Sequence, residues 1–326
     1  MNTKLIVVLV AIFALVSFEA EACFRKKKKE RIIQGTGVSK EVTRPISDFK
    51  AIKVEGNVKI YLEKADSDGK LTLKVDEAFE NYILTKVSDN QLEISQAEKT
   101  LFRCPSKNCQ ETSVTVKTQT LEKLDLVGLV KLETKPLFAT FLPKKFEIRA
   151  EGVVTIFNIG IGTEELSLDS TGIGEFNLYG SAKRATIDAG EKGKVYGQNF
   201  HVTEELNAIC DGYQCEMRLK FKNEATPLAG KVKLTTGGTS NVELRGKGKE
   251  IEMEISGQSS INAVSFTATE AKVDISSDKD STLSVTDKLS VELSGRGDFG
   301  YYGSPADLKI DDEDSKGGKV LKKGSN

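Results

Sequence analysis

Alternating apolar and polar residues, interrupted by glycines, recur along most of the chain. The stretch Leu166–Leu178 is the clearest copy, with alternation on both sides of Gly172 and Gly174. Strict alternation puts one set of side chains on one face of a strand. Glycine tolerates a positive φ where the chain changes direction. The pattern therefore predicts a strand, a turn and a second strand within one short unit.

Comparable units follow one another, with turn positions about 18–25 residues apart, a spacing typical of solenoid repeats. A single unit cannot bury its apolar face, whereas stacked units bury their apolar residues as continuous columns. The other copies are Leu124–Leu132, Phe146–Ile156, Ala185–Gly190, Leu206–Gly212, Val232–Gly238, Ile251–Gly257, Val273–Ser277 and Leu289–Gly295.

The repeat predicts an all-β fold, and specifically a right-handed parallel β-helix or a β-solenoid close to it. The low aromatic content of 7% favours a core of aliphatic columns over one of large rings. An antiparallel sandwich or barrel is the alternative, because its strands also alternate. The sustained period favours the β-helix.

The predicted β-helix domain spans residues 35–310. Its first part is less regular than the later repeats, which predicts an irregular N-terminal cap over the open end of the stack. Residues 311–326 are charged and contain glycine, so we expect a flexible tail there. The acidic run Asp311–Asp314 lacks the glycine-spaced ligand loop of a tight calcium site, and we interpret it as a solvated segment.

The first 22 residues, Met1–Ala22, have the pattern of a secretory signal peptide. The apolar run Leu5–Val16 has 12 residues, which is too short for an ordinary membrane span. The sequence Ala20-Glu21-Ala22 predicts cleavage before Cys23. We therefore expect a secreted protein without a membrane span. The alternative is a cell-surface lipoprotein with a lipid anchor at Cys23.

Charge changes this picture only at the start of the mature chain. Residues 23–34 form a basic leader that contains four consecutive lysines, Lys26–Lys29. Such a run is usually solvated, and the alternative is a patch for acidic surfaces. The whole chain has 47 basic and 48 acidic residues, and this balance does not predict a nucleic-acid partner.

Two segments resemble a known family. Gly35–Gly37 with Thr43–Ile52 is similar to the start of the head GIN domain of putative auto-transporter adhesins, and Ser294–Pro305 is similar to its closing motif. The resemblance extends over residues 35–320 and implies a parallel β-helix at a cell surface or outside the cell. It implies no catalytic residues. Degraded glycine turns and the cysteine pairs mark a divergent member.

Four cysteines form two pairs with the same spacing, Cys104 with Cys109 and Cys210 with Cys215. A secretory route favours oxidation, so we expect two local disulfides. A zinc site with four cysteine ligands is an alternative, although exported chains rarely depend on one. A cross-linked pairing such as Cys104 with Cys210 also fits the sequence. No other metal or cofactor is predicted.

The tripeptide Arg296-Gly297-Asp298 matches the motif that integrin-type receptors read, and it lies in a predicted turn. A structural turn is the simpler interpretation, and cell attachment is the alternative. His201 is the single histidine of the chain and lies in an ordinary strand or corner. No catalytic triad is predicted around it.

Together these patterns predict a secreted structural or adhesive extracellular protein that presents a rigid surface to a polymer, a mineral or a cell. Two outward rows, Glu252 with Glu254 and Glu243 with Arg245, are candidate contacts without a specific ligand. No catalytic activity is expected. The alternative is a β-helical carbohydrate-active enzyme or polysaccharide-binding protein; cleavage would require paired carboxylates in a groove, and no spacing marks such a pair.

Overall fold

The computed structural model describes residues 30–65, 69–104, 111–135, 140–222 and 230–324. The predicted signal peptide and Cys23 lie outside the described residues. What is described is almost entirely β-strand, so the all-β prediction is confirmed. The strands are β1 (Arg31–Gln34), β2 (Ser39–Pro45), β3 (Ala51–Lys64), β4 (Lys70–Asp76), β5 (Ile83–Ser88), β6 (Gln91–Gln96), β7 (Thr100–Arg103), β8 (Ser113–Thr118), β9 (Lys123–Lys135), β10 (Thr140–Phe141), β11 (Lys145–Asp188), β12 (Lys194–Lys222), β13 (Lys231–Gly257), β14 (Ser260–Ser277), β15 (Ser281–Leu293), β16 (Phe299–Tyr302), β17 (Asp307–Asp311) and β18 (Val320–Lys322).

Helical structure contributes very little to the described part of the chain. A single-turn 3₁₀ helix, η1 (Glu80–Tyr82), lies between β4 and β5. Within these ranges, no helix has the length and apolar character needed to cross a bilayer.

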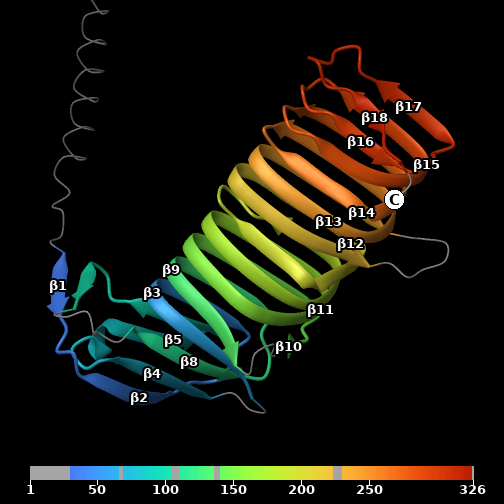
Figure 1. The fold of residues 1–326 in the computed structure, drawn as a ribbon. Coiled ribbons are helices and arrows are strands. Elements are labelled where there is room, and N and C mark those ends of the chain that lie inside the picture. The colour runs from blue at the N-terminus through green and yellow to red at the C-terminus, as the bar shows by residue number, and fades with distance from the viewer. Residues whose placement is uncertain (1–29, 66–68, 105–110, 136–139, 223–229, 325–326) are drawn as a thin grey trace, which may run out of the picture.

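Strands from β9 onward pair in parallel, in the order in which they occur in the chain. Strand β9 lies between β3 and β11, and β12, β13, β14 and β15 follow in sequence. Figure 1 shows these strands side by side, from green β9 to orange-red β15. An antiparallel sandwich would have neighbouring strands in opposite directions, so this part of the chain does not have that architecture.

The strand β11 is 44 residues long because pairing continues through its corners and the chain passes beside itself. Gly152 and Gly172 both belong to β11, and a Cβ atom placed on Gly172 would lie 2.5 Å from the carbonyl oxygen of Gly152. Each repeat unit seen in the sequence therefore corresponds to one layer of the stack, and we call each layer a pass of the chain.

Glycines at the repeated turns lie above one another, and we call this set the glycine column. Its members are Gly56, Gly128, Gly152 and Gly172, and further along Gly190, Gly212, Gly238 and Gly257. Gly128 and Gly152 have φ of +107° and +96°, values that favour glycine. A Cβ on Gly152 would also lie 2.7 Å from the carbonyl oxygen of Gly128, so both conformation and packing require glycine.

The core consists of apolar residues that repeat in register between the strands. Ile52, Leu124 and Ile148 are neighbours in β3, β9 and β11, and all three are fully buried. Burying each such side chain stabilises the fold by about 1.5–3 kcal/mol. Aromatic rings add to the predicted aliphatic columns, because the eight largest fully buried side chains among the described residues are phenylalanines: Phe49, Phe141, Phe146, Phe176, Phe200, Phe221, Phe266 and Phe299.

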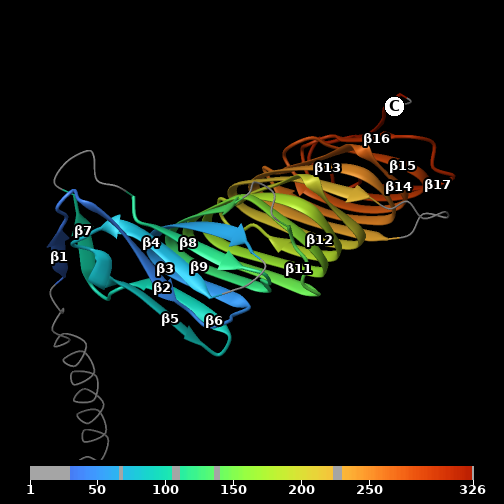
Figure 2. The same cartoon turned by 90° about the horizontal axis from the view of Figure 1, so that it is seen from below.

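The N-terminal strands differ from the rest in the direction of their pairing. Strands β2, β4 and β8 pair in antiparallel fashion, as do β5 and β6, while β1 pairs with β7 in a separate two-stranded sheet. Viewed as in Figure 2, these strands lie at one end of the stack and β15–β17 at the other. The region between residues 35 and 310 thus contains an antiparallel section before the parallel stack.

A buried carboxylate fixes the entry into this section. Asp76 accepts hydrogen bonds from the backbone N–H groups of Thr36 (3.1 Å), Ala78 (3.0 Å) and Gly37 (2.7 Å). Burial by itself would raise the pKa of Asp76, but these hydrogen bonds outweigh it and lower the pKa overall. The ionised carboxylate therefore connects β4 to the segment before β2.

The C-terminal end has more order than a charged tail predicts. Strand β17 continues the stack beside β15, and β18, which lies within residues 311–326, pairs in parallel with β16. One apolar column reaches β17, where Leu308 and Ile310 remain 41% and 42% exposed. They are exposed because β17 has a neighbour on one side only among the described residues.

Candidate functional site

Charged side chains on successive strands form a row that we call the charge ladder. Each member directly precedes an apolar residue of one column. The members are Glu165, Arg184, Glu205, Lys231, Glu250, Glu270, Lys288 and Asp307. The sign of the charge changes at every step except between Glu250 and Glu270. Opposite charges at neighbouring cross-strand positions attract each other, so nearly every step of the ladder is favourable.

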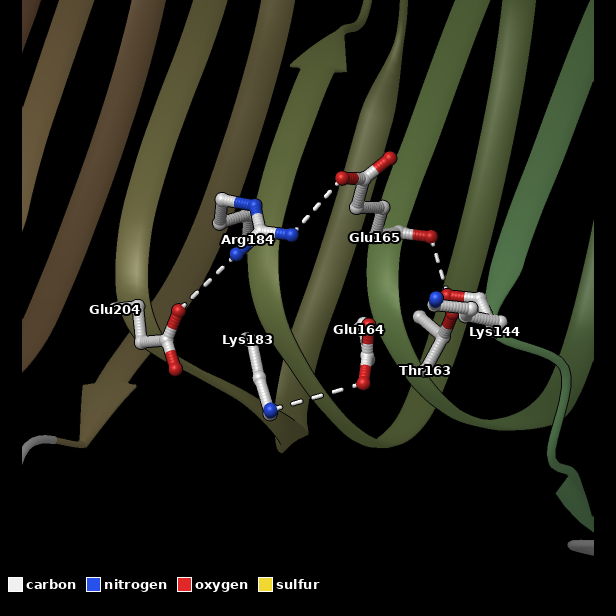
Figure 3. Close-up of polar contacts among 7 residues, drawn as sticks. All are labelled: Lys144, Thr163, Glu164, Glu165, Lys183, Arg184 and Glu204. Atoms are coloured by element: carbon white, nitrogen blue, oxygen red, sulfur yellow. Dashed lines mark hydrogen bonds and ion pairs between the residues drawn. The ribbon is translucent and has the colours of Figure 1, made fainter.

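The first steps of the ladder lie at a corner of the stack (Figure 3). Arg184 contacts two neighbouring passes of the chain: Nη2 donates to Oε1 of Glu165 at 2.9 Å, and Nη1 donates to Oε2 of Glu204 at 3.2 Å. The hydrogen bond between Arg184 and Glu165 raises the pKa of the arginine and lowers the pKa of the glutamate. Beside them, Nζ of Lys183 lies 3.7 Å from Oε1 of Glu164.

A groove of about 580 Å³ follows the ladder across β12, β13, β14, β15 and β17. The ladder from Glu205 to Asp307 forms one rim. The other rim is the outward row two positions further on: Asn207, Lys233, Glu252, Lys272, Ser290 and Lys309. Between the rims lie buried residues such as Val232 and Ile251, whose side chains face the core, so the floor is backbone. Five basic and five acidic residues line the groove.

Ion pairs connect neighbouring strands along this groove. Lys231 and Glu250 lie 2.9 Å apart, and their hydrogen bond raises the pKa of the lysine and lowers that of the glutamate. Lys233 and Glu254 lie 2.8 Å apart with shifts in the same directions. The side chain of Lys231 is 70% exposed, and exposed pairs of this kind contribute little to stability. The order of the charges therefore matters less for stability than for the pattern of charge that the surface presents to a partner.

Not every cation of the groove is neutralised. Within the described part of the chain, neither Lys272 nor Lys309 is in an ion pair with another side chain. Both lie on the rim opposite the ladder. These two lysines give that rim two positive positions that an incoming group can reach.

A second depression lies on another row of outward residues, and we call it the tyrosine pocket. It has a volume of about 260 Å³ and is lined by Asn177, Tyr179, Tyr196, Asn199 and Arg218, together with Leu178. The pairing of β11 with β12 shifts register between Asn177 and Tyr179. Such a bulge redirects side chains and often lies beside a site.

Polar contacts hold the tyrosine pocket in shape. The hydroxyl of Tyr196 donates to Oε2 of Glu216 at 3.3 Å, and the Arg218 guanidinium lies 5.5 Å from the ring centre of Tyr196. Arg218 also forms an ion pair of 2.9 Å with Glu216. Burial and the neighbouring Glu216 raise the pKa of Tyr196, so its hydroxyl keeps its proton at neutral pH.

An adjoining hollow of about 290 Å³, the basic pocket, shares Asn199 and Arg218 with the tyrosine pocket. Its other charged lining residues are Lys220, Glu243 and Arg245. Nε of Arg245 donates to Oε1 of Glu243 at 2.7 Å. The structure thus places the predicted row of Glu243 and Arg245 at the edge of a pocket.

A comparison with protein families decides which family has this architecture. The family described as "Putative auto-transporter adhesin, head GIN domain" matches residues 48–212 and 222–305. The chain belongs to this family. No curated protein matches the sequence of this head GIN domain protein.

Solved structures resemble this head GIN domain protein at low sequence identity. A putative adhesin from Parabacteroides merdae is 14% identical, with a TM-score of 0.48 over 91% of this chain and 100% of its own. One from Bacteroides fragilis is 14% identical, with a TM-score of 0.43 over 90% and 98%. A protein from Parabacteroides distasonis named putative lipid binding protein is 16% identical, with a TM-score of 0.42 over 89% and 100%.

The other predicted row, Glu252 with Glu254, is divided between two environments in this head GIN domain protein. Glu252 lines the groove, whereas Glu254 is paired with Lys233. Sequence reasoning missed both tyrosines of the tyrosine pocket. Their signal is present, since Tyr179 and Tyr196 occupy outward positions of strands in a chain with 7 tyrosines in total.

The predicted disulfide between Cys210 and Cys215 is present, with the two Cα atoms 5.6 Å apart. It closes the corner that carries Tyr213, which is 61% exposed and has the Lys192 ammonium 5.5 Å from its ring centre. Cys104 is also disulfide-bonded, and Cys109 lies outside the described residues.

The Arg296-Gly297-Asp298 tripeptide is part of the packed end of the stack. The Asp298 carboxylate accepts a hydrogen bond from the backbone N–H of Lys319 at 2.9 Å, and its own N–H donates to Asp280 at 2.8 Å. Gly297 is buried, and Arg296 is exposed. These contacts give Asp298 a structural role, and cell attachment through the tripeptide stays a prediction.

His201 and the acidic run lie in different parts of the fold. His201 is half-buried in β12, and Asp311–Asp314 is exposed at the C-terminal end. In the described ranges, no three His, Cys, Asp or Glu side chains are placed to hold a metal ion.

Proposed function

We propose that this head GIN domain protein is a secreted or surface-held adhesive protein, and that its stack is a right-handed parallel β-helix. The parallel register and the pass of β11 beside itself support this form of the stack. Parallel crossovers are almost always right-handed, which supports the handedness. A stack of this kind is rigid and presents outward residues at fixed intervals of about 4.8 Å between strands.

The groove is the observation that carries the adhesive function. It crosses five strands with charged rims on both sides, and it holds Lys272 and Lys309 without ion-pair partners among the described residues. Many weak contacts at fixed spacing add up to firm attachment to a repeating partner. The predicted partners are an extracellular polymer, a mineral or a cell surface.

A sugar-cleaving enzyme is the alternative function, and the neighbouring carboxylates of Glu250 and Glu270 are its best candidates. A general acid needs a raised pKa. Hydrogen bonding to Lys231 lowers the pKa of Glu250, and Glu270 has Lys288 at 3.5 Å. The lowered pKa of Glu250 favours its ionised form, which supports binding without cleavage.

Adhesion can be tested with the purified mature protein on immobilised polyuronate, neutral glucan and calcium phosphate. We expect salt-sensitive binding to at least one surface without release of reducing ends. Lys231→Glu should change this binding, and adding Glu250→Lys should restore it, because the double variant regains the ion pair between positions 231 and 250 with reversed polarity and returns the groove to its original net charge. Release of sugar products would favour the enzyme, and absence of binding to all three surfaces and to cells would refute adhesion.

Localisation follows from the predicted signal peptide and the family, and it requires its own test. The mass of the mature protein from its native host should correspond to a chain that begins at Cys23. An added mass of acyl chains on Cys23 would support the lipid-anchored form. A mass that retains Met1–Ala22 would refute export by signal cleavage.

A further inference from the structure

The tyrosine pocket and the basic pocket form one continuous depression, because Asn199 and Arg218 line both. We propose that this depression binds an acidic glycan, a short stretch of polysaccharide with carboxylate groups on its sugar rings. The inference rests on the proposed adhesive function and deepens it, since it names a class of polymer. It also places the contact on a different row of residues from the groove.

The chemistry of the tyrosine pocket fits a sugar ring. A sugar presents apolar C–H faces and a rim of hydroxyl groups. Tyr179 and Tyr196 are half-buried and supply apolar rings with polar ends. The amides of Asn177 and Asn199 can each donate and accept hydrogen bonds, which matches a hydroxyl group. A pocket with a few polar groups between aromatic rings is typical of a small-ligand site.

The charges of the basic pocket select a carboxylate. Across both pockets the lining has three cations, Arg218, Lys220 and Arg245, against one anion, Glu243. Arg218 and Arg245 already have acidic partners, whereas Lys220 has no ion pair with any other described residue. Lys220 is also exposed, so an incoming carboxylate can reach it. The groove, with equal numbers of both signs, has no such preference.

The arrangement of strands gives the depression its direction. Asn177 is the register neighbour of Tyr196, Arg218 lies beside Tyr196, and Glu243 is the neighbour of Arg218. These four residues therefore come from successive passes of the chain, about 4.8 Å apart. A glycan chain would lie along the stack, with sugar rings near the tyrosines and a carboxylate near Lys220.

Titration calorimetry on the full mature protein can test this inference, with a galacturonic-acid trimer and a galactose trimer as matched probes. We expect the acidic trimer to bind more tightly than the neutral one. Tyr196→Ala should weaken the binding of both trimers by about tenfold, because the aromatic ring is lost. Lys220→Gln should weaken only the acidic trimer, also by about tenfold. Lys86→Gln, in β5 and outside the groove and both pockets, is the control and should leave both affinities unchanged.

Three results would overturn the inference: equal or tighter binding of the neutral trimer, affinities unchanged by Tyr196→Ala and Lys220→Gln, or no binding of the acidic trimer. Tyr196→Leu removes the ring but keeps an apolar side chain, and it provides a second variant with the same expected weakening if Tyr196→Ala does not fold. The groove is tested separately by the Lys231 and Glu250 charge exchange. Groove-dependent adhesion without trimer binding would refute this inference and leave the proposed function standing.

Discussion

Substituting alanine for Gly152 tests whether the glycine column holds the stack together. Gly152 has φ of +96°, and a Cβ atom there would lie 2.7 Å from the carbonyl oxygen of Gly128. The oxygen belongs to the backbone of the neighbouring strand and cannot move without disturbing the parallel pairing. Alanine should therefore strain its own backbone and also separate two strands.

The expected loss of stability has two parts. The left-handed conformation costs a residue with a Cβ about 1–2 kcal/mol. Forcing an extra carbon into a packed contact costs about 1–3 kcal/mol more. Gly37→Ala is the matched control, because Gly37 has φ of +81° but no atom within 4 Å of its hypothetical Cβ. The difference between the two variants isolates the cost of the contact between strands.

Urea unfolding followed by circular dichroism measures both variants. We expect Gly152→Ala to lose about 2–5 kcal/mol and Gly37→Ala about 1–2 kcal/mol, on the same assumptions. Equal losses of unfolding free energy in the two variants would show that the contact between the new Cβ atom at position 152 and the carbonyl oxygen of Gly128 adds no cost. A variant at Gly152 as stable as the unmodified protein would refute the stacked arrangement itself.

Three further perturbations follow from the same structure. Asp76→Asn should lose about 1–3 kcal/mol of unfolding free energy at neutral pH, because buried N–H groups lose a charged acceptor. Since the pKa of Asp76 is lowered in the folded state, the stabilisation by its carboxylate is complete above about pH 4 and disappears as the pH falls through the folded pKa. Unfolding curves in which the variant shows the same loss at acidic pH would contradict this. Replacing Cys210 and Cys215 by serine should cost about 2 kcal/mol in urea unfolding, and no loss would mean that this corner is already rigid without the bond. Lys231→Glu should weaken adhesion to an anionic polymer, with recovery when Glu250→Lys is added, and an unchanged binding curve for the single variant would remove the groove from the adhesive surface.

Much of the parallel stack could be predicted because its causes are local. Alternation at Leu166–Leu178 predicts strands, and the glycines of the repeat predict corners where φ becomes positive. The structure adds that Gly128 and Gly152 are also required by the neighbouring strand, which only the register reveals. The spacing of Cys210 and Cys215 favoured a local disulfide over a zinc site or a cross-linked pairing, because short separations bring two cysteines together at a corner.

The surface sites could not be predicted to the same degree, because they depend on which passes of the chain are neighbours. Glu205 and Lys231 are 26 positions apart in sequence numbering, yet they are register partners. The tyrosine pocket depends on a bulge in β12 between Tyr196 and Asn199, opposite Asn177 and Tyr179 of β11, and one extra residue leaves no clear mark in an alternating pattern. The antiparallel pairing of β2 with β4 was hidden for a similar reason, since alternation does not report strand direction.

The order of charges along the stack, rather than their number, distinguishes its faces. In a parallel, in-register stack, residues at equivalent positions of neighbouring strands lie about 4.8 Å apart. Like charges at these positions would therefore repel each other at each step of a row. The charge ladder avoids this by alternation, and its one like pair has a lysine on each outer side. Four positions further along each strand, the row Glu254, Asp274, Glu292 and Asp311 is acidic at every step. A net charge of −1 therefore conceals a balanced groove, an acidic row and a basic pocket, which present different local charge to the solvent.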